Sequence, residues 1–153
     1  MAYIADLSPI PYEREFQVWG TLSIGWLSRH VPYPKGSTLA NFQDRLFVFC
    51  LNPVLRTRGF HTCEFCSSPA PFLTYVKHRD REIGLGAAEI RVIYRNRVYA
   101  APDLIYHYVV EHQYCPPEEF IEAVLQGPLP GSTEYNLFLE NWHKVYNWGS
   151  AGL

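Results

Sequence analysis

The chain has 153 residues and a formal net charge of −2, with 13 basic and 15 acidic side chains. This length suits a single domain with a core of its own. Affinity for nucleic acids depends on a basic excess that neutralises phosphates, so this charge balance argues against a nucleic-acid binder. The chain lacks the roughly 20 consecutive apolar residues of a membrane span, and residues 1–6 do not resemble a signal peptide. We therefore expect a cytoplasmic protein with reduced thiols.

Aromatic side chains are unusually frequent, at 16% of the chain, with 11 Tyr, 9 Phe and 4 Trp. Tyr and Trp combine a large apolar area with a polar group, so they suit both a core and an interface. We expect most rings in the core and some on a partner-binding face. The arginines are interspersed with acidic residues, which suggests solvated surface; they are Arg56, Arg58, Arg79, Arg81, Arg91, Arg95 and Arg97.

The first third of the chain predicts two short strands, a loop and one helix. Residues 16–19 and 22–27 are β-like runs, and the prolines in 30–36 favour an extended loop. Ser37 or Thr38 then caps a helix that runs to about Leu51. One apolar stripe follows the helical period, at Leu39, Phe42, Leu46 and Phe49. Cys50, near the end of this helix, is expected to be a buried structural thiol.

The middle of the chain predicts strands around a polar connection. Residues 72–76 form one short strand, and residues 77–82 read as a charged connection that leads into a glycine-containing turn at 84–86. Two further β-like runs, 89–94 and 98–100, are separated by Arg95-Asn96-Arg97. This spacing suits a hairpin in which Asn96 tolerates a positive φ.

The last third predicts three helices. Pro102 fits the first turn of a helix that ends near His112, before two prolines, and a second helix covers 117–126. Ser132 caps a third, which ends at about Tyr146. Its apolar stripe consists of Tyr135, Phe138, Leu139, Trp142 and Tyr146. The order of elements predicts one compact α+β domain over residues 1–147, with a small antiparallel sheet and about four helices, followed by a flexible tail over 148–153.

The motif with the most specific chemistry is Cys63-Glu64-Phe65-Cys66. A tight turn brings two such thiolates to about 2.3 Å from one tetrahedral ion, so the pair predicts half of a zinc knuckle. The other half must come from elsewhere in the chain. In a cytoplasmic protein the same spacing also occurs in thioredoxin-like redox pairs, but no βαβ pattern surrounds it here.

The best candidates for the second half are His107 and His112, separated by four residues as in Cys₂His₂ zinc sites. Residues five apart lie roughly 140° apart on an ideal α-helix, so both rings reach one ion only if the last turn loosens. Cys115 and then His61 are the next candidates. Forty residues, 67–106, separate the two halves, which argues for a clasp within a domain and against a DNA-reading finger.

Four protein ligands would close the coordination sphere, which predicts a structural Zn²⁺ ion and no catalytic residues. The alternative is a hydrolase-like zinc enzyme in which Cys63, Cys66 and His107 hold the ion and Glu111 or Glu64 acts as general base. No H-E-x-x-H or deaminase signature supports that alternative. We expect a zinc-stabilised protein-binding or accessory module, with an immunity-type protein as one version. Its partner would be another protein, and neither a membrane nor a nucleic acid.

Several strings in the chain resemble a family of small bacterial proteins of unknown function. They are Gly59-Phe60-His61-Thr62-Cys63-Glu64-Phe65-Cys66, Glu89-Ile90-Arg91-Val92, Tyr99-Ala100-Ala101-Pro102-Asp103-Leu104-Ile105-Tyr106-His107-Tyr108-Val109 and Pro116-Pro117-Glu118-Glu119-Phe120. The resemblance extends over about residues 1–126. It implies a bacterial, cytoplasmic, single-domain protein and carries no activity.

Overall fold

The fold is that of a computed structural model, which describes residues 3–10, 20–57 and 59–151, with side chains described to residue 142. The predicted strand over 16–19 lies outside these residues. The strands are β1 (Leu22–Ser23), β2 (Leu55–Arg56), β3 (Thr74–His78), β4 (Arg81–Leu85), β5 (Ala88–Tyr94) and β6 (Arg97–Pro102). The helices are α1 (Ala40–Leu51), α2 (Ile105–His112), α3 (Glu118–Gln126) and α4 (Thr133–Ala151). This arrangement confirms the α+β prediction.

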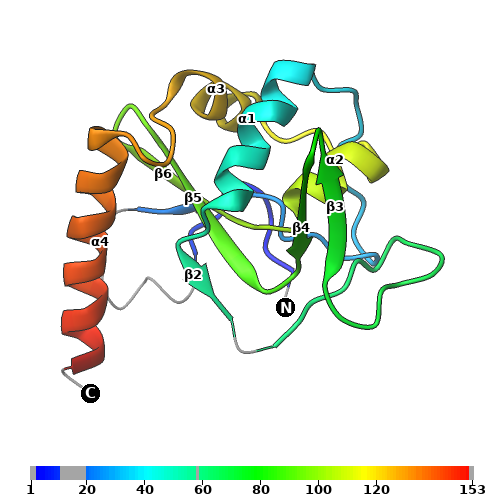
Figure 1. The fold of residues 1–153 in the computed structure, drawn as a ribbon, viewed down its shortest axis with the longest axis horizontal. Helices are drawn as coiled ribbons and strands as arrows, with labels where there is room; N and C mark the ends of the chain where they lie inside the picture. The colour runs from blue at the N-terminus through cyan, green and yellow to red at the C-terminus, as the bar shows by residue number, and fades with distance from the viewer. Residues whose placement is uncertain (1–2, 11–19, 58, 152–153) are drawn as a thin grey trace.

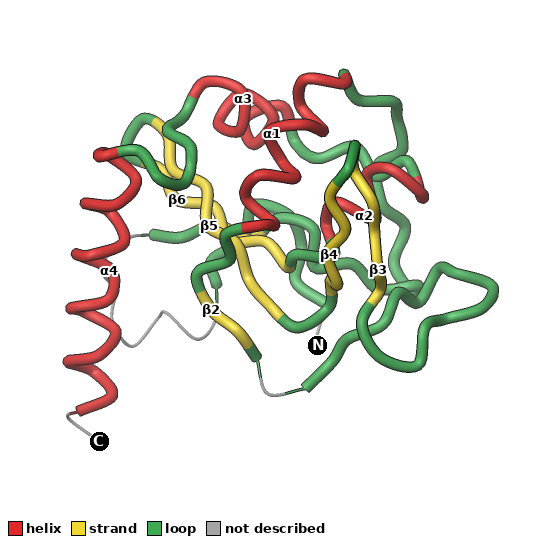
Figure 2. Tube along the Cα trace, in the orientation of Figure 1, coloured by secondary structure: helices red, strands yellow, loops and turns green. Residues whose placement is uncertain are grey.

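The strands form two separate sheets (Figure 1). The main sheet has the order β1-β6-β5-β2 and is mixed, because β1 runs parallel to β6 while the other pairs are antiparallel. The second sheet is the β3–β4 hairpin, at the opposite end of the molecule from α4 (Figure 2). Helices α1 and α3 pack on each other and on β5. The core therefore lies between the main sheet and these helices.

Helix α1 begins later than predicted. Its N-cap is Leu39 and makes no side-chain cap, while the Thr38 hydroxyl accepts a hydrogen bond from the Gln43 side chain. Phe42, Leu46 and Phe49 are buried as expected, but Leu39 is 70% exposed. Cys50 is buried beside the Asp103 carbonyl, as predicted.

The region 77–86 is a second hairpin where the sequence predicted a connection and a turn. β3 continues to His78, Arg79 and Asp80 form the turn, and β4 follows directly. One face of this hairpin is solvated, so charged residues recur along its strands and the sequence resembles a polar loop. The β5–β6 hairpin agrees with the prediction, with φ values of 49° at Arg95 and 63° at Asn96.

Pro102 does not start a helix, contrary to the prediction. It pairs with Glu89 as the last residue of β6, and α2 begins at Ile105. The apolar residues before it are buried in the sheet, and a short apolar run by itself cannot separate a strand from a helix. Helix α3 agrees with the prediction. α4 begins after Ser132, whose hydroxyl accepts from the Tyr135 N–H, and its backbone continues past Tyr146 to Ala151. Flexibility of the tail stays a prediction.

One arginine expected on the surface is fully buried. Arg91 is 0% exposed and pairs with Glu89 at 2.6 Å, and its guanidinium lies 5.0 Å from the centre of the Trp142 ring. A buried charge requires such partners. The contact between Arg91 and Trp142 joins the main sheet to α4.

Asp103 connects the end of β6 to the turn after β4 and so fixes the start of α2. Its side chain is buried, and Oδ1 accepts a hydrogen bond from the Gly86 N–H at 2.9 Å. Burial raises the pKa of Asp103 from 3.8 to about 6, and the hydrogen bonds from Gly86, Ala88 and Leu104 oppose part of that rise.

Because the folded protein holds the Asp103 proton more tightly than the unfolded chain, protonation stabilises the fold. Relative to Asp103→Asn, we expect the free energy of unfolding of the wild type to rise by roughly 1–3 kcal/mol as the pH falls from about 7 to about 4. Urea unfolding of both proteins across this range measures the difference. A difference that is constant with pH would contradict the raised pKa.

Candidate metal centre

The two predicted cysteines lie in the long connection between β2 and β3. The segment is anchored by the His61 N–H, which donates to the Gly86 carbonyl, and by Glu64, whose carboxylate accepts from the Arg29 N–H. Within the knuckle, the Phe65 N–H donates to Cys63 Sγ at 3.3 Å. A backbone N–H directed at a sulfur is the geometry that stabilises a thiolate.

The two predicted histidines lie on α2, at its middle and its last residue. The turn after His107 opens, because the N–H groups of Gln113 and Tyr114 both donate to the Tyr108 carbonyl, farther back than the α-helical partner four residues earlier. Gln113 ends the helix in the left-handed region, with φ of 50°. The loosened turn required for two histidines five residues apart is therefore present.

Cys63, Cys66, His107 and His112 converge at one point, with one potential ligand atom from each within 4.8 Å of all the others. The imidazole Nε2 of His107 lies 3.3 Å from Cys66 Sγ. Nε2 of His112 lies 3.3 Å from Cys63 Sγ and 3.5 Å from Cys66 Sγ. With bonds of about 2.3 Å to sulfur and about 2.05 Å to nitrogen, tetrahedral geometry gives S···N separations of roughly 3.5 Å. These three S···N separations are close to those of a tetrahedral metal site, and the other separations among the four atoms stay within 4.8 Å.

Burial shifts the pKa values of Cys63, His107 and His112 in the direction that favours their neutral forms. Desolvation raises the pKa of the Cys63 thiol to about 11. Desolvation also lowers the pKa of His107, as does the neighbouring His112, and it lowers the pKa of His112. Neutral imidazole is the form that binds metals, whereas each thiol must lose its proton to a bound cation. Once the thiols are deprotonated, the cluster can hold a divalent cation between two thiolates and two neutral imidazoles.

Aromatic rings cover the cluster. Phe65 packs edge-on against Tyr33 and Tyr108, with ring centroids 5.1 and 5.7 Å away, and lies 5.6 Å from the His112 ring. Tyr33 also donates from its hydroxyl to the His112 carbonyl. The predicted loop over 30–36 thereby packs on the end of α2, with the Phe65 ring between Tyr33 and the His112 ring.

The remaining candidate ligands lie outside the cluster. Within the described residues, the metal-ligand group contains neither His61 nor Cys115. Cys115 instead packs beside Gly36, at a distance of 3.5 Å from its Sγ to the position a Cβ would take. Four of the six candidates from the sequence are therefore brought together, and the fourth member of the group is His112 and not Cys115.

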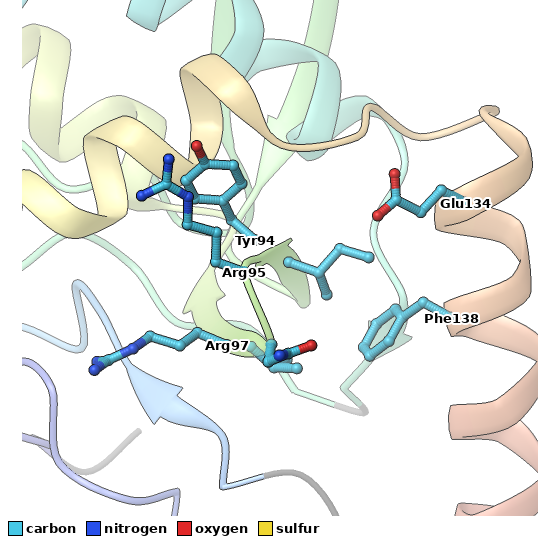
Figure 3. Close-up of a pocket in the computed structure, with 8 residues that line it drawn as sticks. Tyr94, Arg95, Arg97, Glu134 and Phe138 are labelled. Carbon is cyan, nitrogen blue, oxygen red and sulfur yellow. The ribbon is translucent and has the colours of Figure 1, made fainter.

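The surface of the described residues includes the following two hollows. One, of about 250 Å³, lies between β3 and α2 and is lined by Thr74, Tyr75, Val76, Lys77, Tyr106, His107, Val110 and Glu111. The other, of about 400 Å³, lies between the β5–β6 turn and α4. In this second hollow Arg95 and Arg97 extend away from Glu134 and Phe138 (Figure 3). Arg97 pairs with Glu119 at 2.8 Å, and Arg95 stacks on the Tyr94 ring.

We expect one Zn²⁺ ion per chain in the wild type and in Cys115→Ser, because Cys115 lies outside the cluster. His112→Ala, which removes one of the four converging atoms, should weaken zinc binding by at least about tenfold. Elemental mass spectrometry after dialysis gives the stoichiometry, and visible absorption of the Co²⁺-substituted proteins reports the geometry of the site. Equal loss of zinc in both variants would contradict the assignment of the fourth ligand.

No helix in the described part of the chain is both long and apolar enough to cross a membrane. No curated protein and no solved structure matches the chain. A family model described as a domain of unknown function, DUF7919, matches residues 2–125, a span that contains all four residues of the cluster and ends before α4. The chain therefore belongs to this family.

Proposed function

We propose that this protein is a zinc-stabilised protein-binding module without catalytic activity of its own. The observation that carries the proposal is the convergence of Cys63 and Cys66 with His107 and His112. Two thiolates and two imidazoles in tetrahedral array are characteristic of structural zinc sites. All four cysteines are free thiols, which suits a reducing, cytoplasmic location and supports metal over disulfide chemistry.

The position of the cluster supports a structural role. It joins the β2–β3 connection to α2, two segments that the sequence separates by 40 residues, 67–106. That connection contains few buried apolar side chains. Cys63 is buried, but the large rings of Phe60 and Phe72 are both mostly exposed. A segment with little core of its own needs another constraint to remain folded. Zinc binding supplies that constraint because its free energy becomes folding free energy.

A zinc hydrolase is the alternative, with Cys63, Cys66 and His107 as ligands. Its attraction is that Glu111 and His107 line the same hollow. A catalytic zinc ion needs a position open to water, however, and the closeness of His112 to the other three residues favours a fourth protein ligand over water. The other candidate base, Glu64, accepts a hydrogen bond from the Arg29 backbone on the protein surface. These contacts favour the closed, structural site.

The surface supports a protein partner over a nucleic acid. The net charge is −2, and the arginines of the β5–β6 turn are engaged by Glu119 and the Tyr94 ring. Exposed aromatic residues instead lie on β3 and on the zinc-binding loop, which is the β2–β3 connection over residues 57–73. Phe60, Phe72 and Tyr75 are all more than half exposed. Exposed rings of this kind are enriched at protein interfaces. A bacterial accessory protein of the immunity type is one form that such a module takes.

Removal of the metal should destabilise the whole fold. We expect chelation of zinc to lower the Tm by at least about 10 °C, since structural zinc contributes several kcal/mol of folding free energy. Calorimetry or circular dichroism before and after chelation measures this shift, and added Zn²⁺ should reverse it.

The same experiment separates the two functions. A catalytic ion would leave the fold and the Tm nearly unchanged on chelation. A chelated protein that melts at the original temperature, or a purified protein without metal, would overturn the structural clasp. Cys115→Ser serves as the matched control, because it removes a thiol outside the cluster and should keep the zinc-dependent Tm of the wild type.

A further inference from the structure

The β3–β4 hairpin has an outer edge with unused backbone hydrogen-bonding groups. Its strands are joined by the two-residue turn Arg79-Asp80, so the flanking pair His78–Arg81 exchanges hydrogen bonds and the pairs alternate from there. By this alternation the N–H and C=O groups of Tyr75 and Lys77 point away from β4. Within the part of the chain that the structure describes, no backbone hydrogen bond reaches them.

This edge forms one wall of the 250 Å³ hollow, and α2 forms the other. Four consecutive residues of β3, Thr74 to Lys77, line the hollow, as expected if it runs along the strand. From α2 come Tyr106, His107, Val110 and Glu111, which lie on one face because they are spaced by one and four residues. A strand edge opposite a helix is the geometry by which several domains bind a peptide as an added strand.

We propose that the groove between the outer edge of β3 and α2 binds an extended segment of a partner protein, which pairs with Tyr75 and Lys77 as a third strand. The inference rests on the proposed function, because the zinc clasp at His107 and His112 holds α2 as the second wall. It assigns the place and the chemistry of the partner: backbone pairing with alternating side chains.

The chemistry of the walls selects a peptide. An added strand directs alternate side chains to opposite faces, so one set would meet Val110 on α2 while the other would lie beside the exposed Tyr75 ring. Lys77 and Glu111 place opposite charges on the two walls. The Glu111 carboxylate would repel a phosphate backbone, and it suits a segment of mixed or neutral charge.

The aromatic surface continues from the groove toward the zinc-binding loop. Phe72, two residues before β3, packs edge-on against Phe60 with ring centroids 6.0 Å apart. Tyr75 lies over Gly84 of β4, where an added Cβ would approach the Tyr75 ring to 3.2 Å. An apolar side chain of the partner segment would contact these rings, which otherwise leave apolar surface in water.

The probe for this proposal is a phage-displayed library of random linear dodecapeptides, selected on the zinc-loaded full-length chain. We expect an enriched peptide that, once synthesised, binds the wild type and slows amide hydrogen exchange at Tyr75 and Lys77. Lys77→Pro removes one outward N–H from β3 and should weaken binding at least about tenfold, the loss expected for a strand hydrogen bond and its disturbed neighbour.

Glu82→Pro is the matched control. Glu82 is the cross-strand partner of Lys77, so its N–H points to the opposite edge of the hairpin, away from α2. This variant disturbs the same hairpin with the same residue and should bind the peptide within about threefold of the wild type. A peptide that is N-methylated at alternate residues tests the pairing without changing the protein, and it should bind at least about tenfold more weakly than its parent.

Zinc content and Tm are measured for each variant, so the clasp and the groove are tested separately. A metal-free chain that binds the peptide at the β3 edge would contradict the proposed structural zinc site but would support the proposed peptide-binding groove. The groove proposal is overturned if no peptide is enriched, if Lys77→Pro binds as tightly as Glu82→Pro, or if protection from exchange falls elsewhere. It is also overturned if the β3 edge of the free protein proves to be paired with a second copy in solution.

Discussion

The arrangement of the hairpin end of this molecule depends on the convergence of four ligand atoms from two segments distant in the chain. Cys63 and Cys66 lie in a connection with little buried apolar surface, and His107 and His112 lie on a helix of only eight residues. Helices of this length are not stable alone, and a loop whose aromatic residues face water gains little from the hydrophobic effect. Each segment therefore needs the other, and the spacing of the two sulfurs and two nitrogens indicates that a single cation joins them.

The four residues that converge could be predicted from sequence because metal chemistry constrains residue type and spacing strongly. Two cysteines separated by two residues reach one tetrahedral ion, and this requirement is local. Whether His112 or Cys115 joins the other three residues is not determined by the local sequence. It depends on the left-handed Gln113, which ends α2, and on the contact of Cys115 with Gly36 in a loop some 80 residues earlier in the chain. Neither constraint is present in the spacing of the motif itself.

The predictions of secondary structure were confirmed where one face of an element is buried. They failed where the environment of a residue is determined by residues distant in the chain. Phe42, Leu46 and Phe49 show the helical period because one face of α1 is buried. Pro102 resembled a helix start, but its pairing with Glu89 makes it the last residue of a strand. Arg91 resembled a surface residue in a polar stretch, whereas Glu89 and Trp142 allow its burial. The burial and secondary structure of such residues depend on contact partners that sequence patterns do not reveal.

The family match ends at residue 125, before α4, while the clasp, the hairpin and α2 all lie within it. The pairing of Glu89 and Arg91 within β5 thus lies inside the match, whereas Trp142, which covers the arginine, comes from outside it. Burial under α4 removes the Arg91 guanidinium from water, and the Glu89 carboxylate and the Trp142 ring together offset that cost. By contrast, the four converging residues and the Phe65 ring beside His112 all belong to the matched span. The four converging residues and the β3 edge both lie within the span that the family model matches, so zinc-dependent stability is a property to test in other members of the family.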